Sequence, residues 1–205
     1  MKKVIAICLG ALLVMALAAC GANKEDMRPA TEFPAEPLVY RADLTHDGTD
    51  ETIAVDLSRL ETQGAQNAKV SVFGGGEKLL WSGDASIIHA GNNGIYLYRE
   101  NEYAYLLTWH PYAGQGAAYL RYEIFSLDEN GEALIYRKGE GNYRLDAEMS
   151  AGFNGRLAEA NLFIRDVNRY LERSVLLVAT TTEGAYFGTP EQPVVRLADE
   201  FPWDY

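Results

Sequence analysis

The sequence predicts an α+β domain, mostly antiparallel β-sheet built from hairpins, with one amphipathic helix packed on it. Three observations predict this class. From Leu38 onward, short runs of aromatic and β-branched residues alternate with turn residues. A single segment, between Gly155 and Arg173, has helical periodicity. The 13 tyrosines and 3 tryptophans suit half-buried rows of rings on a twisted sheet, with a carbohydrate-stacking surface as the alternative use.

The first elements are two strands, 38–40 and 52–57, on either side of an Asp-rich loop. Three hairpins follow, pairing 69–73 with 78–81, 95–99 with 103–109, and 118–127 with 133–137. Asn130-Gly131 in the last turn is the strongest local hairpin signal. The first and third hairpins both place a phenylalanine before the turn and Gly-Glu at it, so an internal duplication remains an open alternative.

The helix is predicted over 155–173. Its apolar residues recur at spacings of three and four, which puts them on one face, and they are Leu157, Ala160, Ile164, Val167 and Leu171. Asn154 is the expected N-cap. The continuous apolar run 174–180 predicts a buried interior strand, and 194–197 predicts a last edge strand.

The first twenty residues have the pattern of an export signal. Lys2 and Lys3 precede an apolar run, 4–18, that is shorter than the roughly 20 residues needed to span a bilayer. The run ends in Leu17-Ala18-Ala19-Cys20, which resembles the lipobox of bacterial lipoproteins. The resemblance implies cleavage before Cys20, lipid on its thiol, and anchoring at the extracytoplasmic face of the cell membrane. An ordinary secreted protein is the alternative.

The resulting organisation is a signal peptide at 1–19, a lipidated cysteine with a flexible tether at 20–37, and a single β-rich domain at 38–205. Losing Lys2 and Lys3 takes the formal net charge from −11 to −13, which argues against nucleic acid as a partner. Cys8 leaves with the signal and Cys20 carries the lipid. The mature domain therefore has no cysteine for thiol chemistry or for zinc.

The strongest local motif runs from Asp43 to Glu51. Oxygen donors at alternate positions, followed by a glycine, can wrap a short loop around a hard cation. The segment resembles a single calcium loop of the FG-GAP and VCBS type of β-hairpin repeat. The resemblance implies Ca²⁺ held by Asp43, Thr45, Asp47, Thr49 and Glu51. The alternative is an Asx-turn, in which Asp43 and Asp47 accept backbone N–H groups without metal.

The remaining candidates for ligand contact surround the histidines. His89 precedes a Gly/Asn-rich turn, and His110 opens a segment, 110–116, that reads as a loop carrying Tyr112 and Gln115. Histidines hydrogen-bonded at strand ends are the structural alternative. If these residues form one site, the Tyr112, His89 and Asp43 segments should converge.

No catalytic signature occurs, since Gly-x-Ser-x-Gly is absent and the glycine run at 74–76 lacks the residues of a phosphate-binding loop. The sequence therefore predicts a membrane-anchored, extracytoplasmic, non-catalytic domain that binds an unknown ligand or envelope protein. One alternative is an envelope hydrolase or glycan-processing enzyme with its site near His89 and His110. The other is a purely structural or assembly lipoprotein.

Overall fold

The computed structural model describes residues 35–57, 67–86, 93–114, 116–144, 155–181 and 184–186. These residues form two mostly antiparallel sheets and one helix, with β8 and β9 the single parallel pair among them, so the predicted α+β, β-rich class is confirmed. Among them, no helix is long and apolar enough to cross a membrane. The signal peptide, Cys20, His89, Gln115, Asn154 and the predicted strand 194–197 lie outside the described residues.

The smaller sheet has four strands in sequence order. They are β1 (Leu38–Ala42), β2 (Glu51–Asp56), β3 (Asn67–Phe73) and β4 (Leu79–Ser86). A short 3-10 turn, Gly75–Glu77, joins the last two, so the glycine run forms the predicted hairpin.

The larger sheet has seven strands in the order β11-β10-β5-β6-β7-β8-β9. In chain order these are β5 (Asn93–Glu100), β6 (Tyr103–Gly114), β7 (Ala117–Leu127), β8 (Ala133–Arg144), β9 (Gly155–Arg156), β10 (Ser174–Thr181) and β11 (Gly184–Tyr186). Both further hairpins are thus present, β5–β6 and β7–β8. The apolar run that predicted an interior strand is β10, which lies between β11 and β5.

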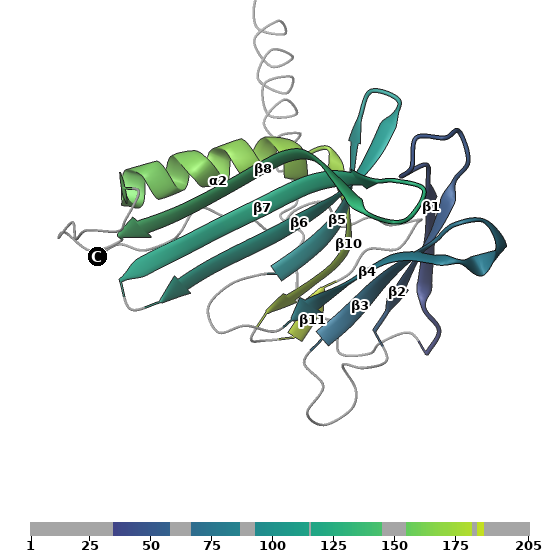
Figure 1. Ribbon diagram of the computed structural model, residues 1–205. Coiled ribbons are helices and arrows are strands. Elements are labelled where there is room, and N and C mark those ends of the chain that lie inside the picture. The colour runs from purple at the N-terminus through teal and green to yellow at the C-terminus, as the bar shows by residue number, and fades with distance from the viewer. Residues whose placement is uncertain are drawn as a thin grey trace, which may run out of the picture.

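Helix α2 (Leu157–Leu171) confirms the predicted helix and packs on one face of the larger sheet, as Figure 1 shows. Ala160, Ile164, Val167 and Leu171 are all buried there against the sheet. The opposite face packs on the four-stranded sheet around a second core, which includes Ile53, Val70, Leu106 and Phe125. Alternation along each strand supplies both cores, because successive side chains point to opposite faces.

Two strands of the larger sheet are longer than the sequence predicts. β6 continues through His110 and Pro111 to Gly114, where the sequence predicts a loop. Proline is tolerated here because β5 pairs with β6 only as far as Trp109, so among the described residues no strand lies on that side of Pro111. β8 continues from Arg137 to Arg144 through two glycines. Figure 1 shows the long β6, β7 and β8 running well past the smaller sheet.

Candidate functional site

The Asp43–Glu51 segment is organised around a buried carboxylate. Glu51, at the start of β2, is only 4% exposed. One carboxylate oxygen accepts the backbone N–H groups of Leu44 at 2.7 Å and Thr45 at 3.1 Å. The other accepts the Thr45 hydroxyl at 3.1 Å. This side chain therefore satisfies donors of its own loop.

The two aspartates of this segment are also occupied by backbone donors. Asp43 accepts the N–H groups of Asp47 at 3.1 Å and Gly48 at 2.9 Å, and Asp47 accepts that of Thr49 at 2.7 Å. These are the contacts of the Asx-turn alternative. Within the described ranges, no group of three or more His, Asp or Glu side chains is arranged to hold a metal ion. The calcium hypothesis stays a prediction.

The same segment joins the two sheets. Leu44 is fully buried, and its carbonyl accepts the N–H of Leu127 at 2.9 Å. His46, in a left-handed conformation with φ of 59°, bonds through Nε2 to the Ala104 carbonyl at 2.9 Å. Its ring also packs on Tyr103 and Tyr105, with centroids 4.8 and 5.1 Å apart. This structural role was not predicted from the sequence, because partners some sixty residues away leave no local signal.

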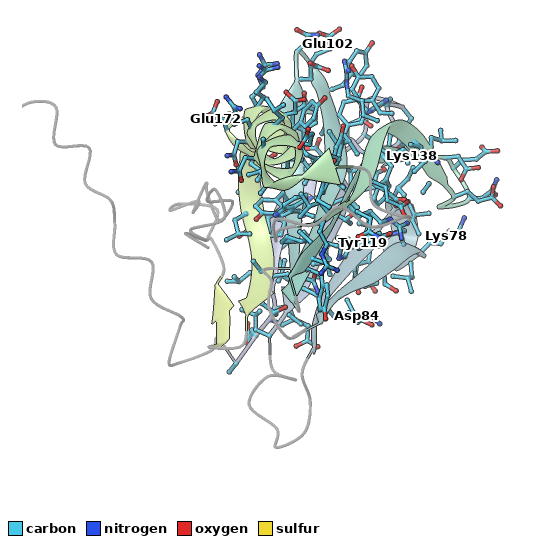
Figure 2. All side chains as sticks on the ribbon, turned by 90° about the vertical axis from the view of Figure 1, so that its left-hand side faces the viewer. Lys78, Asp84, Glu102, Tyr119, Lys138 and Glu172 are labelled. Carbon is cyan, nitrogen blue, oxygen red and sulfur yellow. The ribbon has the colours of Figure 1, made fainter. Side chains whose placement is uncertain are left out.

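His110 and Tyr112 lie elsewhere, on the sheet face opposite α2. We call this surface the open face and define it by alternate residues of β6 and β7, namely Thr108, His110, Tyr112, Tyr119, Arg121 and Glu123. These six residues are partly buried or exposed. Leu106 and Phe125, which continue the same face under the smaller sheet, are buried. The register places His110 opposite Arg121 and Tyr112 opposite Tyr119. In Figure 2 Tyr119 lies on the side of the sheet away from the helix.

His110 is held in a defined state at the buried end of the open face. Its Nδ1 lies 3.1 Å from Oδ1 of Asn93, a buried residue of β5. Burial lowers the pKa of His110, and the positive charge of Arg121 lowers it further. The imidazole is therefore neutral at pH 7 and donates from Nδ1 to the amide oxygen, which leaves Nε2 as an acceptor.

The exposed end of the open face combines rings with paired charges. Arg121 donates to Glu123 at 2.6 Å, and the Tyr119 hydroxyl donates to Glu140 of β8 at 2.6 Å. That last bond is the main reason the pKa of Tyr119 is raised. Tyr112 is 42% exposed, so its ring is accessible to a ligand. The surface can accept and donate hydrogen bonds and can stack against an apolar group.

The Asp43 and Tyr112 segments do not converge, so the idea that they share one site is wrong. The Asp43 loop docks beside Ala104, near the start of β6. Tyr112 lies eight residues further along that strand, about 26 Å away at the usual rise per residue. These two segments therefore form separate features. The position of His89 lies outside the described residues.

An aromatic cluster beside the helix end was also not predicted as a site. Tyr136 stacks on Tyr105 at 4.8 Å and donates to Glu100 at 2.6 Å, while the Arg137 guanidinium lies 4.9 Å from the Tyr136 ring centre. The hydrogen bond from Tyr136 is the largest cause of the lowered pKa of Glu100. Spacing in the sequence could not reveal it, since its members come from three strands.

Comparison of the chain with models of protein families, with curated proteins and with solved structures gives no match.

Proposed function

We propose that this protein is a lipoprotein of the bacterial envelope, anchored by lipid on Cys20 at the extracytoplasmic face of the membrane. Its domain binds an envelope partner through the open face and performs no catalysis. The single observation that carries the binding role is the accessible Tyr112 ring. It lies in register with Tyr119 and close to the fixed His110 and the Arg121–Glu123 pair.

The composition of the open face supports recognition of a polar partner. Interaction surfaces are typically enriched in tyrosine and arginine, which provide contact area and directed hydrogen bonds at low entropic cost. Arg121 and Glu123 are already paired, so less side-chain entropy is lost when a ligand binds to them. The neutral His110 adds an acceptor whose orientation Asn93 fixes.

The alternative is a hydrolase that uses His110. An acid–base histidine is usually oriented by a carboxylate, which stabilises the imidazolium formed during proton transfer. Here the hydrogen-bond partner of His110 is the neutral amide of Asn93, and the nearby Arg121 disfavours protonation more than Glu123 favours it. Both features favour a binding role for this histidine over a catalytic one.

The anchor is tested by changing Cys20 to serine. Cells fed radiolabelled palmitate should label the wild-type chain and leave Cys20→Ser unlabelled, because the thioether needs the thiol. The variant should also leave the washed membrane fraction. Wild-type protein that carries no label and is released into the medium would contradict the anchor.

The binding surface is tested by photo-crosslinking in intact cells. A benzophenone amino acid at position 112 should give a discrete adduct of higher mass on irradiation. Position 162 is the matched control, because Leu162 is 52% exposed on α2, on the other side of the sheet. An adduct from neither position, or the same adduct from both, would rule out the open face as the binding surface.

The calcium hypothesis has its own measurement. If the Asp43–Glu51 loop binds Ca²⁺ with the weak affinity of extracellular modules, millimolar calcium should raise the Tm of the wild-type protein. Asp47→Ala should remove this calcium-dependent rise, since it deletes one proposed ligand. An unchanged Tm at millimolar calcium would identify the loop as an Asx-turn without metal.

A further inference from the structure

The outer edge of β8 is a long, exposed strand edge. Its inner edge pairs with β7 along its whole length, but β9 pairs only with Tyr143 and Arg144. In the described part of the chain, no strand lies against 133–141. Leu134, Ile135 and Tyr136 are 52%, 47% and 42% exposed on this stretch. An edge of this kind presents unpaired backbone N–H and C=O groups, and these groups bind another extended strand.

The regular part of this edge is short and well defined. The pairing of β7 with β8 shifts register between Ile124 and Phe125, so Tyr136 is the extra residue of a bulge. On the far side, β9 begins to cover the edge at Tyr143. The uninterrupted uncovered segment between these limits, from Arg137 to Gly141, is therefore centred on Gly139.

Charges on this segment are complementary to those of a second copy. Lys138 and Glu140 point to the same face of the sheet, opposite α2, because they are two residues apart in a regular strand. An antiparallel pairing about Gly139 sets each Lys138 against Glu140 of the other copy. We propose that two copies of this chain associate through β8, antiparallel and centred on Gly139, so that their seven-stranded sheets become continuous.

Symmetry excludes pairings centred between two residues, and like charges disfavour those centred on the neighbouring charged residues. A two-fold axis normal to the sheet places the α2 faces of both copies on the same side of the joined sheet. Directly opposed residues then share a face only if the pairing is centred on a residue. Centring on Arg137, Lys138 or Glu140 would place that charge directly opposite its own copy, which destabilises a strand pair. Gly139 is the residue between these charges, and it brings opposite charges together twice.

On the face under α2, the centre of the seam carries no β8 side chain, because Gly139 lies at the axis in both copies. Arg137 is on this face too, and the pairing sets it against Gly141 of the other copy. A side chain at 139 would overlap the ring of Tyr122 and lie 3.1 Å from Phe163. Internal packing therefore explains why residue 139 is a glycine. The absence of a side chain at the centre of the seam follows from that packing.

Site-specific crosslinking tests the pairing without requiring purified protein. Two differently tagged full-length chains are produced in the same cells, one carrying Lys138→Cys and the other Glu140→Cys. A short bis-maleimide should join them, because directly opposed Cβ atoms lie about 4.5–5.5 Å apart. The product is a covalent dimer that carries both tags. Lys78→Cys in both chains is the control, since Lys78 lies on the β3–β4 turn.

A charge exchange gives the second measurement. Lys138→Glu alone and Glu140→Lys alone should each reduce co-purification of the two tagged chains at least tenfold, because like charges then meet. The double variant Lys138→Glu/Glu140→Lys should restore wild-type recovery. The outcomes that overturn the proposal are a two-tag adduct no stronger than the Lys78 control, an adduct with a different protein only, or co-purification insensitive to charge. None of these measurements depends on the Cys20 anchor or on Tyr112.

Discussion

Gly131→Ala is expected to destabilise the protein by roughly 2–5 kcal/mol. Gly131 lies in the β7–β8 turn with φ of 90°, a left-handed conformation that costs other residues about 1–2 kcal/mol. A Cβ there would also overlap the backbone carbonyl of Leu80, in β4 of the other sheet. Overpacking of this kind adds about 1–3 kcal/mol. Lys78 donates to the Glu129 carbonyl at 3.2 Å, so the two hairpin tips are already in contact.

Gly48→Ala is the matched control for this prediction. Gly48 has nearly the same φ, 88°, but a Cβ there would meet nothing within 4 Å. It should therefore show the backbone cost alone, about 1–2 kcal/mol. Chemical denaturation of both variants measures the difference. Equal losses would show that the contact between the Gly131 turn and Leu80 does not contribute to stability.

Glu51→Ala is expected to cost about 3 kcal/mol. The buried carboxylate accepts three hydrogen bonds from Leu44 and Thr45, and its removal leaves the buried Leu44 N–H without an acceptor. The loss should extend to the contact between the sheets, because this loop also presents the Leu44 carbonyl to Leu127. For a chain of this size the Tm should fall by roughly 6–12 °C, measurable by thermal unfolding.

Asp47→Ala, measured without calcium, is the control for Glu51. Asp47 accepts one exposed backbone N–H, that of Thr49, so its loss should cost no more than about 1 kcal/mol. A Glu51 variant as stable as this control would show that the buried carboxylate does not organise the loop. Both variants should retain palmitate labelling, since the proposed labelling depends on Cys20.

Local sequence patterns predicted much of the fold. The glycine run at 74–76 and Asn130-Gly131 mark turns because they permit left-handed backbone, and both hairpins are present. The predicted helix boundaries lie within about two residues of the observed ones, because a 3.6-residue repeat of apolar side chains is typical of an amphipathic helix and not of a strand. Both signals depend only on residues close together in the chain, so they can be recognised without a structure.

The lengths of the strands were predicted less well. The prediction ended β8 at Arg137, because Gly139 and Gly141 are weak strand formers. In the structure the space above Gly139 is filled by Tyr122 and Phe163, and that above Gly141 by the Tyr143 hydroxyl. Tertiary packing thus requires glycine where propensity argues for a loop. The same error placed His110 and Tyr112 in a loop, although they are paired residues of β6.

By itself, the sequence determined the α+β class, the hairpin turns, the helix and the residues available for a lipid anchor or a cation. Only the tertiary structure decided which of these residues meet. It buried Glu51 among its own backbone donors, and it placed His110 and Tyr112 on a face shared with Arg121 and Tyr119. It also left the outer edge of β8 uncovered along 133–141 in the described chain. The physical reason is that periodicity and turn chemistry act over a few residues, whereas strand pairing and burial join segments separated by tens of residues.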